Sequence, residues 1–172
     1  MAFQPKIITA LVLLVSWLIF ASAGLFYFGN QHYGPFDPDK QWQNPLAAVF
    51  SIEALGIAAT AGKQVVHVRL AQCACNNHVN AHISRLNNDS QLAATAQFTR
   101  QVSEITVAGL ALPAAPAVLI FENGQMIYAG PYASGPLCSP SDSLIAPILR
   151  NEVQLAGVWL NGEAQACRCL TG

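Results

Sequence analysis

Residues 64–83 read QVVHVRLAQCACNNHVNAHI, and this stretch decides the fold that the sequence predicts. Its first half is rich in β-branched residues, which favour a strand over residues 64–71. Cys73 and Cys75 follow at once, and the next residues predict a helix from Asn76 or Asn77 to about Asn88. Three apolar side chains at helical spacing should face the core: Val79, Ile83 and Leu86.

A strand that brings two thiols to the start of a helix indicates sulfur chemistry. The N-terminus of a helix carries unsatisfied N–H groups and a partial positive charge, and both favour the thiolate form of a nearby cysteine. Cys75 is nearer the helix start, so we expect it to be the more ionised of the pair. Cys73 should lie at the exposed end of the strand.

The second informative stretch is LPAAPAVLIFENGQMIYAGPY, residues 112–132. Residues 117–121 and 125–129 are β-rich runs, and Asn123-Gly124 between them is a strong signal for a tight hairpin turn. Pro116 precedes the first run. Because proline has no N–H to donate, we expect it at the opening edge of that strand, where a cis bond can form.

The remaining segments carry weaker patterns. Residues 46–61 predict a covering helix and residues 90–101 a second helix, whereas residues 103–109 resemble a short strand. A helix should follow Cys138, with good start residues at 139–142. Residues 158–169 predict a small terminal hairpin that turns at Asn161-Gly162.

The N-terminal segment is apolar enough for a membrane. Residues 7–28 carry no charge, and 22 residues of α-helix cover roughly the 30 Å of a hydrocarbon core. We therefore divide the chain into an anchor or signal (1–28), a linker (29–45) and a domain (46–172). Lys6 favours a cytoplasmic N-terminus, so the expected location is a single-pass membrane protein with its domain on the exported, periplasmic side.

Charge excludes two classes of partner. The formal net charge is −1, with only eight Lys and Arg residues in 172. This composition provides neither the basic surface that nucleic acid requires nor a polybasic patch for anionic lipid.

The order of these elements resembles the thioredoxin superfamily across residues 62–155. More narrowly, the Cys-x-Cys motif, the segments LPAAPAV (112–118) and GPYASG (130–135) and the terminal Cys-x-Cys are similar to a family of membrane-anchored, exported thioredoxin-like proteins. The resemblance implies an α/β fold with a central mixed sheet flanked by helices. It also implies a cis Pro116 lying against an active-site disulfide. The chain departs from thioredoxins in having one residue, not two, between Cys73 and Cys75.

Thiol–disulfide exchange is the first functional hypothesis for the cysteines. Cys73 and Cys75 would attack and resolve mixed disulfides with thiols or disulfides of exported proteins, without a cofactor, and Pro116 would shape the substrate groove. The other three cysteines would act as a relay or form further disulfides: Cys138, Cys167 and Cys169.

Two other hypotheses remain open. The cysteines can be structural disulfides that stabilise an exported domain. Alternatively, Cys73, Cys75, Cys167 and Cys169 can supply thiolates to copper or zinc, with His78 or His82 as a further ligand. On an extended strand, Cys167 and Cys169 would point to the same face with Cα atoms roughly 6.5 Å apart, which places them poorly for bonding to each other.

Overall fold

The computed structural model describes residues 5–43, 50–135 and 137–172. The chain divides into two compact units between His32 and Tyr33. The first unit is the helix α1 (Pro5–His32), whose residues Pro5–Gly29 are long and apolar enough to cross a bilayer. Such a helix fits a single membrane span and equally a signal sequence.

The linker predicted for residues 29–45 was wrong. α1 continues to His32, and the next residues form the strand β1 (Tyr33–Pro35), which belongs to the second unit. Phe36 is fully buried and packs against Trp42, their ring centroids 5.6 Å apart. These aromatic side chains make the segment part of the core, and the predicted domain start at residue 46 is too late.

The second unit, residues 33–172, is built on a mixed sheet in the order β3-β2-β5-β6-β7. β2 pairs in parallel with β3 and antiparallel with β5, β5 pairs antiparallel with β6, and β6 pairs in parallel with β7. Their bounds are β2 Lys63–Arg69, β3 Ala96–Gln101, β5 Ala117–Glu122, β6 Gln125–Gly130 and β7 Trp159–Leu160. The unit is therefore an α/β fold with a mixed sheet, as predicted, and this sheet has five strands.

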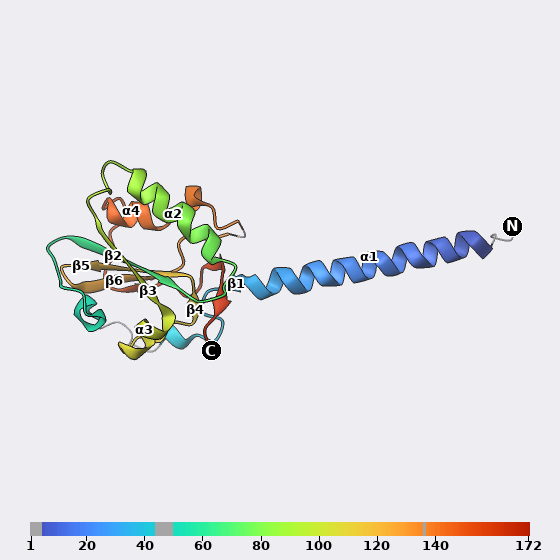
Figure 1. The fold of residues 1–172 in the computed structure, drawn as a ribbon, viewed down its shortest axis with the longest axis horizontal. Coiled ribbons are helices and arrows are strands. Elements are labelled where there is room, and N and C mark those ends of the chain that lie inside the picture. The colour runs from blue at the N-terminus through green and yellow to red at the C-terminus, as the bar shows by residue number, and fades with distance from the viewer. Residues whose placement is uncertain (1–4, 44–49, 136) are drawn as a thin grey trace. The chain divides into compact units, whose positions relative to one another are not determined.

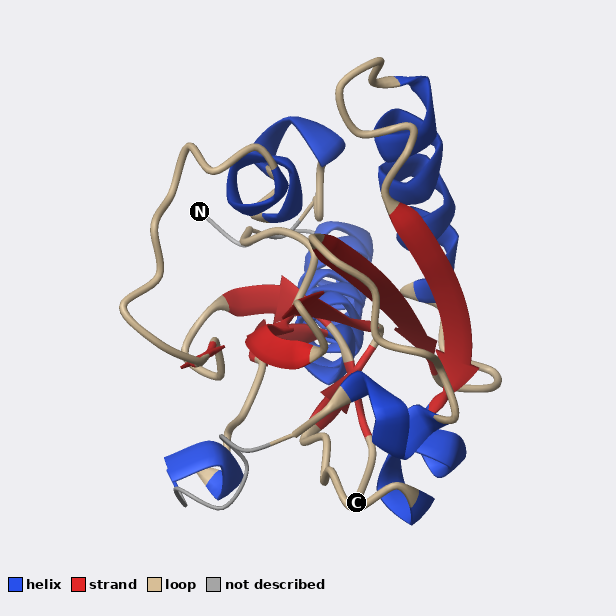
Figure 2. Ribbon diagram, turned by 90° about the vertical axis from the view of Figure 1, so that its left-hand side faces the viewer, coloured by secondary structure: helices blue, strands red, loops and turns tan. Residues whose placement is uncertain are grey.

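Helices cover both faces of the sheet (Figures 1 and 2). α2 (Asn76–Asn88) and α4 (Ile145–Leu149) lie on one face, and α3 (Val102–Val107) lies on the other (Figure 1). Alternate side chains of β5 point to opposite faces of the sheet. Both faces are covered, so β5 is buried on both sides. Leu119 and Phe121 join the apolar cluster on the α3 side, whereas Val118 and Ile120 join the cluster under α2 and α4.

The hairpin and the first strand–helix unit confirm the sequence prediction. Asn123 and Gly124 connect β5 to β6 and both have positive φ, 51° and 84°. A side chain at residue 124 would also place its Cβ 2.8 Å from Ala59 Cβ. Glycine is therefore required there both by the positive φ and by the lack of space. Val79 and Leu86 of α2 are buried and Ile83 is half-buried against the same cluster.

Two segments have the opposite secondary structure to that predicted. Residues 96–101, placed in a helix, form β3, because they pair in register with β2 along one edge of the sheet. Residues 103–109, placed in a strand, lie mostly in α3, where Glu104 accepts a hydrogen bond from the Gln101 N–H at 2.7 Å. That contact caps the helix start.

The helix predicted over residues 46–61 lies partly outside the described residues. From residue 50 onward the prediction was wrong: a short 3-10 helix, η3 (Ile52–Leu55), follows Ser51, which caps it, and ends at Gly56 with φ 69°. A second one, η1 (Gln41–Gln43), precedes it.

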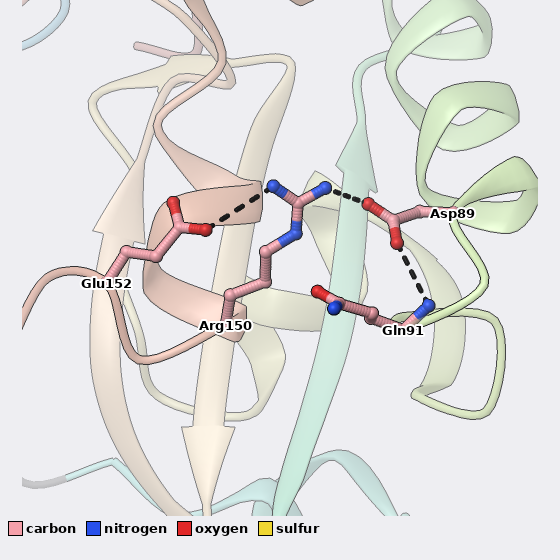
Figure 3. A network of polar contacts seen from close by, with 4 residues as sticks. All are labelled: Asp89, Gln91, Arg150 and Glu152. Atoms are coloured by element: carbon pink, nitrogen blue, oxygen red, sulfur yellow. Dashed lines mark hydrogen bonds and ion pairs between the residues drawn. The ribbon is translucent and has the colours of Figure 1, made fainter.

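An ion pair joins the ends of α2 and α4 (Figure 3). Asp89 follows the last residue of α2, Arg150 follows the last residue of α4, and the two side chains are in direct contact. The hydrogen bond from the Arg150 guanidinium is the main cause that lowers the pKa of Asp89.

The helix predicted after Cys138 is divided into η4 (Pro140–Asp142) and α4.

The terminal hairpin prediction was wrong. β7 joins the main sheet, whereas β8 (Gln165–Cys167) pairs antiparallel with β1, and β9 (Cys169–Leu170) pairs antiparallel with β4 (Ala114–Ala115). The segment after Gly162 therefore runs beside residues distant in the sequence instead of folding back on β7.

Candidate functional site

The loop between β2 and α2 holds the first two cysteines. Cys73 N–H bonds to the Leu70 carbonyl at 3.3 Å, and the Asn76 side chain reaches the same carbonyl at 2.6 Å. Cys75 stands at the N-cap of α2, the position for which we expected an asparagine. Both cysteines are buried, Cys73 at 7% exposure and Cys75 at 1%. The expectation of an exposed Cys73 was wrong.

Two disulfides cross-link this loop to the C-terminal strands. Cys73 is bonded to Cys169 and Cys75 to Cys167, with Cα–Cα distances of 6.0 and 5.8 Å. Cys73 and Cys75 are therefore not bonded to each other in this oxidised state. Cys167 and Cys169 do not bond to each other, as their alternation along an extended segment predicts.

Backbone pairing holds the C-terminal cysteines in place. Cys167 lies opposite Tyr33 of β1, and Cys169 lies opposite Ala115 of β4. Between them, the buried Arg168 donates from Nε to the Pro35 carbonyl. The positions of Cys167 and Cys169 therefore depend on hydrogen bonds as well as on the disulfides.

The four bonded sulfurs form one group, which we call the sulfur cluster: Cys73, Cys75, Cys167 and Cys169. The Sγ atoms of Cys73, Cys75 and Cys169 all lie within 4.8 Å of one another. These three sulfurs come from two different disulfides, and Cys167 Sγ is bonded to one of them. The two disulfides are thus neighbours in the fold, and they bring together the four cysteines that the metal hypothesis grouped.

Pro116 lies beside the sulfur cluster, as predicted. The Ala115–Pro116 bond is cis, and Cys73 Sγ lies 3.6 Å from the Ala115 carbonyl oxygen. A cavity of about 10 Å³, room for roughly one water, has Pro116, Cys75 and Cys167 in its lining. Tyr132 also lines this cavity.

Comparison with known sequences identifies the family. A family model described as a domain of unknown function (DUF6436) matches residues 41–171. The chain belongs to the DUF6436 family. No curated protein and no solved structure matches the chain. All five cysteines and Pro116 fall within the matched residues, so the sulfur cluster lies inside the DUF6436 domain.

The fifth cysteine of this DUF6436 domain, Cys138, carries a free thiol. Its sulfur accepts a hydrogen bond from the Cys167 N–H at 2.9 Å and lies 3.6 Å from the Gly135 carbonyl. The side chain is 7% exposed, and burial raises the pKa of the thiol. Cys138 therefore borders the Cys75–Cys167 disulfide as a protonated thiol.

Two buried histidines surround Tyr132 in the same DUF6436 domain, and sequence reasoning missed both. The sequence suggested His82 only as a possible metal ligand, but it is 2% exposed and contacts the Cys138 carbonyl through Nε2 at 3.0 Å. His67 on β2 bonds through Nδ1 to the Tyr132 hydroxyl at 2.7 Å. Burial lowers the pKa of each imidazole. His78, by contrast, is exposed and contributes to the cavity lining.

Proposed function

We propose that this DUF6436 domain performs thiol–disulfide exchange at the sulfur cluster. The observation that carries the proposal is that three sulfurs from two disulfides lie within 4.8 Å of one another. A thiolate released from one disulfide is then close to a sulfur of the other. Isolated structural disulfides have no need of such a neighbour.

The outer disulfide, Cys73–Cys169, receives the incoming thiol. Cys169 and Cys167 are both half-buried, but Cys73 is 7% exposed and Cys75 only 1%, so the Cys73–Cys169 disulfide is the more accessible of the two to an external thiolate. The new bond forms between the external sulfur and Cys169 Sγ, and Cys73 leaves as a thiolate. The second thiol of a dithiol partner then attacks the external sulfur, which releases Cys169 and leaves the partner oxidised by two electrons.

The released Cys169 thiolate can pass reducing equivalents to the Cys75–Cys167 disulfide. It attacks Cys75 Sγ, forms a Cys75–Cys169 bond and displaces Cys167 as a thiolate. One disulfide is broken and one is formed, so this step needs no further oxidant or reductant. A second dithiol partner reduces the Cys75–Cys169 bond, which completes the four-electron reduction of the sulfur cluster to four thiols.

Fold and location support the same function. The parallel strands β2 and β3, the hairpin β5–β6 and the cis Pro116 at its start resemble thioredoxin-like domains, whose cis proline lies against the active-site disulfide. α1 fits a membrane anchor, and we place the domain on the exported side, where disulfides persist. The partners are then thiols or disulfides of exported proteins.

Timed reduction of the full chain in detergent tests the proposal. Limited dithiothreitol, rapid alkylation and mass spectrometry give the rate at which each disulfide opens. The comparison is between Cys73→Ser/Cys169→Ser, which keeps only Cys75–Cys167, and the matched control Cys138→Ser, which keeps both disulfides. We expect Cys75–Cys167 to open at least about tenfold more slowly in the double variant, because it has lost the internal thiolate.

Two results would contradict exchange. An unchanged rate for Cys75–Cys167 in the double variant would show that the two disulfides do not communicate. The second result is that both disulfides resist dithiothreitol until the fold melts, with melting measured by circular dichroism. The disulfides would then only stabilise the domain.

A further inference from the structure

The spacing of the sulfur cluster also fits a metal ion. Zinc binds four thiolates at about 2.3 Å in a tetrahedron, which sets neighbouring sulfurs roughly 3.8 Å apart. Cys73, Cys75 and Cys169 already have their Sγ atoms within 4.8 Å of one another. Cys167 is bonded to Cys75, so the fourth sulfur is adjacent to this group.

We propose that reduction of both disulfides converts the sulfur cluster into a four-thiolate site for a thiophilic d10 ion, zinc or copper(I). Two dithiol molecules supply the four electrons and four protons that open the two disulfides, and each dithiol becomes a disulfide. The metal then replaces the four thiol protons. Disulfide bonding and metal binding by these four sulfurs are therefore mutually exclusive.

The scaffold keeps the ligands together once the disulfides are open. Cys73 and Cys75 are held by the turns before α2, including the 3.1 Å bond from the Asn76 N–H to the Cys73 carbonyl. The strand pairs β8–β1 and β9–β4 hold Cys167 and Cys169, and the Thr171 N–H adds a 3.2 Å bond to the Pro113 carbonyl. Preorganised ligands favour metal binding because little chain entropy is lost.

Neighbouring side chains define the limits of the site. The four cysteines complete a tetrahedron, so His78 is not required as a ligand, although it lines the cavity beside Cys75. Cys138 lies outside the three closest sulfurs, and its thiol contacts the Cys167 backbone instead. Cys138→Ser is therefore a matched cysteine control.

Cobalt(II), a spectroscopic substitute for zinc, tests the site in the full chain in detergent. The protein is reduced without oxygen, freed of reductant and titrated with cobalt, and zinc is then added as a competitor. We expect one cobalt per chain, with the thiolate charge-transfer and visible bands of a tetrahedral site, and their loss when zinc displaces it. Zinc should also protect four cysteines of the reduced chain from alkylation.

Variants assign the ligands. Cys73→Ser, Cys75→Ser, Cys167→Ser and Cys169→Ser should each lose the four-thiolate spectrum, while Cys138→Ser and His78→Ala keep it. Absence of binding to the reduced protein would overturn the proposal whether or not the metal-free chain is folded, as would equal binding to the oxidised protein. This experiment measures equilibrium metal binding, so its result is independent of the disulfide-opening rates that test the proposed function.

Discussion

Tyr132 Oη donates a hydrogen bond to His67 Nδ1 over 2.7 Å in the core beneath the cavity. The direction follows from the other imidazole nitrogen, because His67 Nε2 lies 2.9 Å from the Gln97 Oε1 acceptor and must carry the proton. The two rings also stack, with centroids 5.7 Å apart and planes within 9°. This pair connects β2 to the loop that carries Cys138.

Tyr132→Phe should reduce the free energy of unfolding by about 1–3 kcal/mol, because it leaves His67 Nδ1 buried without its donor. Urea unfolding of the full chain in detergent measures the change. A loss below about 0.5 kcal/mol would contradict a buried, dry hydrogen bond at this position.

Acid should weaken the fold through the buried histidines. Burial holds the pKa of His67 and of His82 below the ordinary value of 6.5. Below about pH 6.5 the unfolded chain therefore binds more protons than the folded one, so stability is fully present above that pH and falls toward the lowered pKa values. Urea midpoints at about pH 7.5 and about pH 5.5 test this, and a midpoint that rises in acid would contradict it.

Cys138 should resist alkylation in the folded protein. Its thiol is 7% exposed and burial raises its pKa, so little thiolate is available at neutral pH. Without reductant, mass spectrometry should find no iodoacetamide adduct on native protein and one adduct per chain after denaturation. Rapid native labelling of Cys138, or more than one adduct after denaturation, would contradict the assigned thiol and disulfides.

Gly34→Ala should loosen the strand that carries Cys167. The added Cβ would lie 2.6 Å from the Arg168 guanidinium, which must then move away from the Pro35 carbonyl that it contacts. Loss of this buried charged hydrogen bond should cost about 1–2 kcal/mol in unfolding free energy. Gly172→Ala is the control, because its added Cβ would meet nothing within 4 Å. Equal stability of the two variants would contradict the role of this contact.

Local sequence patterns correctly predicted the strands and the turn whose structure depends on their own residues. β2 and β5 are apolar runs buried on both faces, and Asn123-Gly124 fits the positive φ angles that its turn requires. β3 was missed because its partner, β2, and not its own pattern, makes it a strand. α3 was missed because its N-cap is Gln101, which is not one of the residues that mark a helix start, although the Gln101 N–H bonds to Glu104 in the structure.

The candidate site was predictable only in part. The spacing of Cys167 and Cys169 along an extended segment correctly predicted that they do not bond to each other. Their true partners could not be found locally, because each disulfide spans more than ninety residues, 96 for Cys73 and 92 for Cys75. The burial of His82 could not be predicted from its own helix, because it arises from the Cys138 loop, which lies far along the chain.

These long spans also affect biosynthesis. Cys73 and Cys75 leave the ribosome long before Cys167 and Cys169 exist, and Cys138 is made in between. Oxidation in the order of synthesis would join the early cysteines to each other or to Cys138. The native cross-links therefore need either delayed oxidation or an isomerase that reshuffles the early pairs, so the yield of correctly bonded protein should depend on the cell's disulfide-reshuffling capacity.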